Sequence, residues 1–196
     1  MDSKRTIETT IDTEPESKRS KTLVTEIHEA CMKGETEKVS NLLKDSENFD
    51  MKEIDKKGTL IFALKKGYIE IVEVLLKHGA DANSKTKHGD PVLNIASDFG
   101  NVAIVRKLLQ NGANVNTISK LKGYSPLHSA CEKGHIEIVK ELLKFNALLD
   151  AKELFNKTPL YLASTFGFSG HMDVVELMVK SGANLNLQNT CRIQER

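Results

Sequence analysis

The chain of 196 residues has no tryptophan, and aromatic residues make up only 5% of it. Apolar residues still supply 39%, so a core must be built mainly from aliphatic side chains. An excess of charge is also missing, because 28 Lys and Arg stand against 27 Asp and Glu, for a net charge of +1. This balance argues against a strongly basic nucleic-acid-binding protein, so nucleic acid is not an expected partner.

Cysteine and long apolar runs are scarce as well. Cys31, Cys131 and Cys191 are odd in number and widely spaced, which predicts no disulfide framework and a reducing compartment. The N-terminus has no apolar segment behind its charges, so no secretory signal is expected. No stretch reaches the roughly 18 unbroken apolar residues of a membrane span. We expect a protein of the cytoplasm, the nucleus or both, with no membrane partner.

Residues 1–21 are dominated by charged residues, Ser and Thr. Such a segment buries too little apolar surface to offset its chain entropy, so we expect a disordered tail. Its two basic clusters resemble a bipartite nuclear-import signal, for which an import receptor would be the partner. An ordinary solvated tail is the alternative. The residues of the signal would be Lys4, Arg5, Lys18, Arg19 and Lys21.

An internal repeat determines the expected fold. Glycines recur in steps of 33 or 34 residues, and an alanine precedes each by four positions. Leu-Leu pairs follow in the same phase. The glycines are Gly34, Gly67, Gly100, Gly134 and Gly167.

Each unit predicts two short helices. Ser125 is placed to cap a helix that begins at Pro126, and Gly134 is placed to end it in the left-handed conformation. A second helix follows over 136–144, where apolar residues recur at helical spacing. Asn146 suits its end, because Asn tolerates the left-handed conformation best after Gly.

These units resemble ankyrin repeats. The segment 123–147, GYSPLHSACEKGHIEIVKELLKFNA, matches the family pattern closely, and Gly79-Ala80-Asp81-Ala82-Asn83 matches its end. The resemblance implies an all-α repeat solenoid in which helix-turn-helix pairs are joined by β-hairpin turns. It covers residues 22–189 and leaves a short tail, 190–196. The expected units are 22–54, 55–86, 87–119, 120–152 and 153–189.

Three units depart from the family pattern. The first has Thr25-Glu26-Ile27-His28 where Thr-Pro-Leu-His is expected, and an irregular end from Asp45 to Ile54. The second has Gly58-Thr59-Leu60 at the start of its first helix. The fifth carries three extra residues, Phe168-Ser169-Gly170.

The resemblance implies a protein-binding scaffold without an active site. Its ligand would lie in a concave groove, formed by the ends of the first helices and by hairpin positions such as Lys87, Leu121 and Lys122. The early end of this groove is lysine-rich, whereas the later end carries aromatic residues, which commonly anchor interfaces. The candidate binding residues are Lys65, Lys66, Asp98, Phe99, Tyr124, Glu132, Lys133, Phe155, Thr165 and Phe166.

Neither catalysis nor metal binding is expected from the sequence. The pairs His28-x-x-Cys31 and His128-x-x-Cys131 have the spacing of half a zinc site, but they occupy the ordinary His and small-residue positions of the repeat. No catalytic motif or phosphate-binding loop is present. We therefore expect no enzyme, no cofactor and no metal.

Several roles remain open within the class of binding proteins: a transcription-factor inhibitor, a ubiquitin-ligase substrate receptor or a signalling scaffold. The alternative is an ankyrin fragment of a larger structural, channel or ubiquitin-ligase substrate-receptor chain.

One modification is also implied by the resemblance. Ankyrin proteins are substrates of a cytosolic asparaginyl hydroxylase that favours Leu eight residues and Asp two residues before the target. Leu75 and Asp81 stand in these positions before Asn83. Asn116 fits less well, since Asn114 replaces the Asp. The alternative is that Asn83 only hydrogen-bonds its hairpin.

Overall fold

The computed structural model of the chain describes residues 16–45, 51–56, 58–165 and 169–185. Within these ranges the chain forms helices joined by short loops, with one isolated antiparallel bridge between Lys85 and Pro91. The helices are α1 (Glu16–Lys33), α2 (Thr36–Lys44), α3 (Met51–Lys56), α4 (Thr59–Lys66), α5 (Ile69–Lys77), α6 (Val92–Phe99), α7 (Val102–Gln110), α8 (Pro126–Lys133), α9 (Ile136–Lys144), α10 (Pro159–Thr165) and α11 (Ser169–Lys180).

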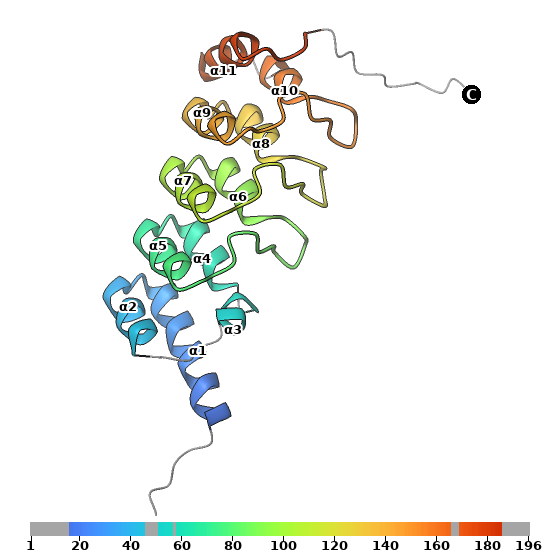
Figure 1. The fold of residues 1–196 in the computed structure, drawn as a ribbon. Coiled ribbons are helices and arrows are strands. Elements are labelled where there is room, and N and C mark those ends of the chain that lie inside the picture. The colour runs from blue at the N-terminus through green and yellow to red at the C-terminus, as the bar shows by residue number, and fades with distance from the viewer. Residues whose placement is uncertain (1–15, 46–50, 57, 166–168, 186–196) are drawn as a thin grey trace, which may run out of the picture.

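The helices stack in two rows (Figure 1). One row, which we call the inner row, contains α1, α4, α6, α8 and α10; the outer row contains α2, α5, α7, α9 and α11. The loops that join consecutive units project to one side of the stack, next to the inner row. The expectation of an all-α repeat solenoid is confirmed.

Helix ends follow the predicted chemistry. The Ser125 hydroxyl accepts a hydrogen bond from the His128 backbone N–H at 3.3 Å, and the Ser125 N–H donates to His128 Nδ1 at 3.1 Å. This reciprocal pair fixes the start of α8. Gly134 ends the helix in the left-handed region at φ 70°, and Asn146 adopts φ 62° after α9.

The N-terminal segment corrects one expectation. We expected residues 1–21 to be disordered, but α1 begins at Glu16, so this is wrong for 16–21; residues 1–15 lie outside the described part. Val24 and Ile27 are buried in the core and anchor the helix. Once a helix is nucleated, each added residue needs little further free energy, which allows the helix to continue upstream of the buried residues.

The junction between the first two units also differs from the expected hairpin. Residues 51–56 form the short helix α3 there. Met51 and Ile54 stand three residues apart and are both buried, so a helical turn brings them to the same face. In the fifth unit, α11 begins at Ser169, so two of the three extra residues form the first turn of a longer outer helix.

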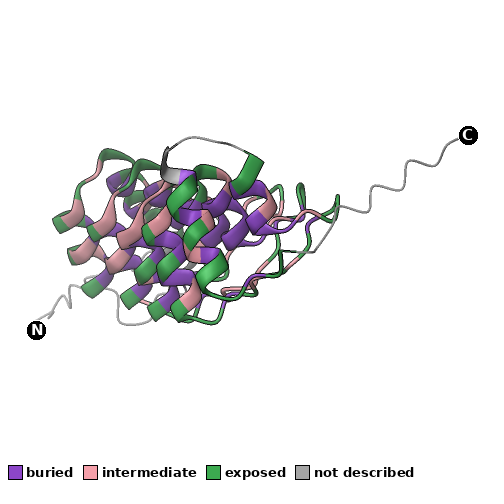
Figure 2. Ribbon diagram, turned by 90° about the horizontal axis from the view of Figure 1, so that it is seen from above, coloured by how far each residue is buried: buried purple, intermediate pink, exposed green. Residues whose placement is uncertain are grey.

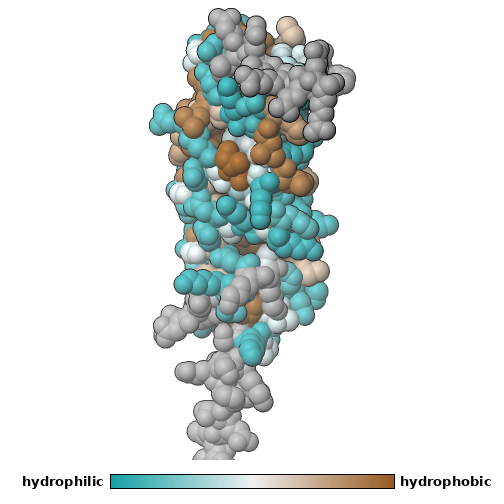
Figure 3. All heavy atoms as spheres, turned by 90° about the vertical axis from the view of Figure 1, so that its right-hand side faces the viewer, coloured by the Kyte–Doolittle hydropathy of each residue, from teal (hydrophilic) through white to brown (hydrophobic). Residues whose placement is uncertain are grey.

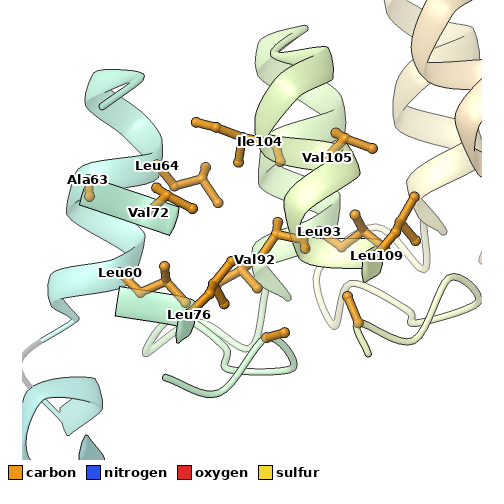
Figure 4. Packing of buried hydrophobic residues seen from close by; sticks show 14 of the residues in the cluster. Leu60, Ala63, Leu64, Val72, Leu76, Val92, Leu93, Ile104, Val105 and Leu109 are labelled. Atoms are coloured by element: carbon orange, nitrogen blue, oxygen red, sulfur yellow. The ribbon is translucent and has the colours of Figure 1, made fainter. Parts of the chain in front are cut away.

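The core is a continuous aliphatic layer between the rows. Figure 2 shows buried segments in the middle of the stack and exposed ones on its outer turns and loops. In Figure 4, Leu64 and Val72 of the second unit point toward Ile104 of the third. All three side chains are buried. Each unit therefore covers the apolar face of the next, as a repeat array requires.

Asparagine side chains tie neighbouring units together beside the core. The Asn83 side chain accepts the Asn114 backbone N–H at 2.7 Å and donates to the Gly112 carbonyl at 3.0 Å. Asn116 repeats this one unit later, accepting the Leu148 N–H at 2.9 Å. These bonds satisfy backbone groups that the short loops leave without a helical partner.

Histidines make similar ties between units. Nε2 of His135 lies 3.2 Å from the Asp98 carbonyl oxygen, and Nε2 of His171 lies 2.8 Å from the Glu132 carbonyl oxygen.

Cys131 is buried, which raises the pKa of its thiol and makes it unreactive. Among the described residues, no group of three potential ligands is placed to hold a metal ion.

Ion pairs cross the outer row. Glu73 of α5 contacts Lys107 of α7 at 2.9 Å, and Arg106 of α7 contacts Glu141 of α9 at 2.9 Å. Hydrogen bonds from Lys107 and Lys77 lower the pKa of Glu73, and a bond from Arg106 lowers that of Glu141. The outer helices thus carry paired charges, which add little to stability where they are exposed.

Two glycines, Gly123 and Gly112, show how closely neighbouring repeat units approach each other. Gly123 and Gly112 both have left-handed backbones, at φ 70° and 82°. A Cβ on Gly123 would lie 2.9 Å from the Leu154 backbone nitrogen, whereas one on Gly112 would meet open space.

We predict that Gly112→Ala lowers the free energy of unfolding by about 1 kcal/mol, through the strain of its left-handed backbone alone. Gly123→Ala should cost at least about 1 kcal/mol more, because backbone atoms must move. Urea unfolding of both variants measures this, and equal costs would contradict the close approach.

Burial of His128 predicts a pH dependence of stability. Nδ1 of this ring accepts the Ser125 N–H, so the neutral ring carries its proton on Nε2, 3.1 Å from the Lys157 carbonyl oxygen. Burial lowers the pKa of His128 below its usual 6.5. The unfolded chain then binds the proton more readily, so stability is complete above pH 6.5 and falls as the pH drops below it.

The test is the free energy of unfolding from about pH 8 to about pH 5. The matched variant is His128→Asn, since Asn94 occupies the equivalent position of the third unit and donates to the Tyr124 carbonyl at 2.6 Å. We expect this variant to lose less stability than the wild type between neutral and acidic pH. The rest of the chain is the same in both proteins, so its contribution cancels in the comparison. Parallel pH profiles would show that His128 does not contribute.

Candidate protein-binding groove

A groove of about 630 Å³ runs along the inner row, between the helices and the projecting loops. The helices α4, α6 and α8 form one wall, and two hairpin loops form the other. The first loop closes with a bond from the Thr86 N–H to the Asp90 carbonyl, at 2.9 Å, and the second with one from Ser119 to Tyr124, at 2.8 Å. The Ser119 hydroxyl donates to Asp90 Oδ1 at 2.5 Å and so joins the two loops.

The lining residues come from these elements and from the end of α3. They are Asp55, Gly58, Ile61, Lys65, Lys85, Thr86, Lys87, His88, Asp90, Asn94, Ile95, Asp98, Phe99, Ser119, Leu121, Lys122, Tyr124 and Ser129.

Two large apolar side chains are exposed in this lining. Phe99, at the end of α6, is 57% exposed, and Leu121, in the second loop, is 73% exposed. Ile95 lies one helical turn before Phe99 and is half-buried. Seen from the loop side, apolar side chains gather toward the C-terminal half of the face, with hydrophilic ones below them (Figure 3). Exposed apolar side chains grouped in a groove favour a binding surface.

Tyr124 is part of the groove wall rather than a free anchor. Its ring stacks on His128 with 5.6 Å between centroids, and its hydroxyl donates to Glu132 Oε1 at 3.1 Å. Desolvation and the nearby Glu132 carboxylate raise the pKa of Tyr124 to about 12. Lys122 lies over the ring at 4.8 Å and contacts Glu132 at 3.6 Å. This network fixes the second loop against α8.

The structure brings together some of the predicted binding residues and separates others. Lys65, Asp98, Phe99 and Tyr124 line the groove. The others with described side chains lie outside its lining: Lys66, Glu132, Lys133, Phe155 and Thr165. Phe166 lies outside the described residues.

Most of the predicted residues outside the groove lining make contacts with neighbouring side chains or backbone groups. Lys133 pairs with Asp98 at 3.7 Å, and Lys66 lies over the Phe62 ring at 5.7 Å. The Thr165 hydroxyl donates back to the Tyr161 carbonyl at 2.8 Å within α10. Phe155 is 65% exposed at the tip of the loop after α9. Of the predicted aromatic residues whose side chains the structure describes, Phe99 and Tyr124 line the groove and Phe155 does not.

Several lining residues were missing from the predicted set, among them Ile61, Lys85 and Ile95. Ile61 and Ile95 precede Lys65 and Phe99 by four residues, so they lie on the same helix face one turn earlier. That spacing would have found both. Lys85 stands just before the first loop, and its place depends on the path of the backbone, which the repeat pattern does not specify.

The predicted import residues are only partly described. Lys18, Arg19 and Lys21 belong to the first turns of α1, and Lys21 is exposed. Lys4 and Arg5 lie outside the described residues, so the import signal stays a prediction. A search of the described helices finds none long and apolar enough to cross a membrane.

Stacked helix pairs with projecting loops define a helical repeat protein. A sequence model of ankyrin repeats in three copies matches residues 27–119 and again residues 93–189. Together these matches cover more than half of the chain. The chain belongs to the ankyrin repeat family, whose repeats serve as protein–protein interaction modules.

Two similar proteins are NF-kappa-B inhibitor alpha from pig (Sus scrofa) and from human (Homo sapiens). Each is 37% identical to this chain over 76 residues. The match covers 36% of this chain and 23% of each relative. The alignment thus spans about a quarter of the length of these relatives.

Asn83, the predicted modification site, is held in a closed hairpin. Its backbone N–H donates to Asp81 Oδ1 at 2.8 Å, and its side chain makes the two bonds to the next unit described above. Asn116 has nearly the same surroundings, with its N–H bonded to Asn114 Oδ1 at 3.0 Å. The two sites therefore differ mainly in the charge of the residue two positions earlier.

This contrast sharpens the hydroxylation prediction. After incubation with an asparaginyl hydroxylase, we expect peptide mass spectrometry to find one added oxygen on Asn83 and less on Asn116. Asn114→Asp should raise the modification of Asn116, because it supplies the missing carboxylate. An unmodified Asn83 would rule the prediction out.

Proposed function

We propose that this chain is a non-enzymatic adaptor that binds a partner protein through the concave groove. The observation that carries the proposal is the exposure of Phe99 and Leu121 inside the same groove. Such side chains lose contact with water when a partner covers them, which stabilises a complex.

The rigidity of the groove supports the same function. Its helices are fixed by the aliphatic core, and its loops are joined by the bond between Ser119 and Asp90. A preformed surface loses little conformational entropy on binding. No step of this function requires a cofactor or a reaction.

Capture of partners on the full chain, followed by mass spectrometry, identifies the protein to be tested. We predict that Phe99→Ala and Leu121→Ala each weaken its binding by about 1–3 kcal/mol in calorimetric titration. Both side chains are exposed, so melting should stay cooperative and near the wild-type temperature.

Phe145→Ala is the matched control, because this ring is 38% exposed at the end of the outer helix α9. It should leave the affinity unchanged. If all three variants bind like the wild type, the groove is not the binding surface. Loss of cooperative melting in Phe99→Ala would instead place this ring in the core.

A further inference from the structure

Three lysines at the N-terminal side of the groove have no ionic partner among the residues that the structure describes. Lys65 stands on α4, and Lys85 and Lys87 flank Thr86 at the first loop. All three are exposed. Their charges therefore face the groove and the solvent, where a bound anion could reach them.

Each acidic group of the same groove has a hydrogen-bond or ion-pair partner within the protein. Asp90 accepts the Ser119 hydroxyl, and Asp98 pairs with Lys133. Asp55 Oδ2 accepts the Asp81 backbone N–H at 3.2 Å. Four lysines and three aspartates line the groove, so its lining carries a small excess of positive charge: Lys65, Lys85, Lys87 and Lys122 against Asp55, Asp90 and Asp98.

The groove therefore has two chemically different ends. The lysines belong to the second and third units, and the exposed Phe99 and Leu121 belong to the third and fourth. A ligand that fits both ends must carry carboxylates on one part and a large apolar side chain on the next. Polypeptide segments can combine these groups over a few residues.

We propose that the groove takes an extended protein segment in which an acidic cluster lies beside one or more large apolar residues. The acidic side chains pair with Lys65, Lys85 and Lys87, and the apolar residues cover Phe99 and Leu121. This proposal rests on the proposed function and specifies the chemistry of the partner. Single-stranded nucleic acid fits less well, because its charge is spread along the whole strand, whereas Lys65, Lys85 and Lys87 lie at one end of the groove.

A random-peptide display library selected on the full chain tests the proposal. We expect the enriched peptides to carry Asp or Glu clusters next to Leu, Ile or Phe. Synthetic peptides from the selection are then titrated by fluorescence anisotropy at low and high salt. Combining Lys65→Glu, Lys85→Glu and Lys87→Glu should weaken their binding about tenfold or more, and added salt should weaken wild-type binding.

The matched control combines Lys44→Glu, Lys77→Glu and Lys140→Glu, which makes the same change of charge on the outer helices α2, α5 and α9. It should leave the affinity within about twofold of the wild type. Circular dichroism melting checks that both triple variants fold. If the groove variant does not fold, Lys→Gln at the same three positions removes the charges without reversing them, and a several-fold loss of affinity is then expected.

The outcomes separate this proposal from the groove function itself. Peptides that lose affinity in Phe99→Ala but show no acidic enrichment, and bind the lysine variant normally, would overturn the acidic ligand and leave the groove function standing. A selection without any Phe99-dependent peptide would overturn both. If random-sequence oligonucleotides bind through the three lysines and displace the selected peptides, the ligand of the groove is nucleic acid and the proposed acidic protein segment is wrong.

Discussion

The structure depends on the fact that no unit can bury its own apolar face. A pair of helices of eight or nine residues, such as α6 and α7, leaves one side of each helix open. The next pair closes it, as Leu64 and Val72 do against Ile104. Stability therefore accumulates from unit to unit, and the spacing of the units is set by aliphatic packing. The positions of the groove residues follow from that spacing, because the inner helix of each unit contributes residues to the same wall of the groove.

Polar ties fix the loops that packing alone leaves loose. The bonds from Asn83 and Asn116 satisfy backbone groups of the following unit, and His128 holds the loop after α9 through the Lys157 carbonyl. Because these ties run from one unit to the next, each loop takes its position from its neighbour. In the groove, Asn94 donates to the Tyr124 carbonyl and the Ser119 hydroxyl donates to Asp90, so its two loops are tied to an inner helix and to each other.

Much of this fold could be predicted from local signals. Ser125 with Pro126, the left-handed Gly134 and the aliphatic spacing of α9 each specify a helix start, end or face within a few residues. These local sequence signals fail where contacts with residues distant in the sequence determine the conformation. Residues 16–21 are polar enough to be disordered alone, yet they continue a helix anchored by Val24 and Ile27. The partial burial of Tyr124 could not be predicted either, because it depends on the stacking with His128 and the bond to Glu132.

The groove lies where the repeat pattern is broken. In the fourth unit, His128 ties the inner helix to the next loop, and Asn94 does the same in the third unit. Ile61 stands at this position in the second unit and has no side-chain donor for the loop at 86–90. It instead adds apolar surface to the groove. Gly58 replaces the capping Ser or Thr in the same unit and also lines the groove, where it presents no side chain. Local violations of a fold's rules are commonly tolerated at functional sites. Here the two substitutions remove a tie and a side chain from the second unit, beside Lys65, which has no ionic partner among the described residues.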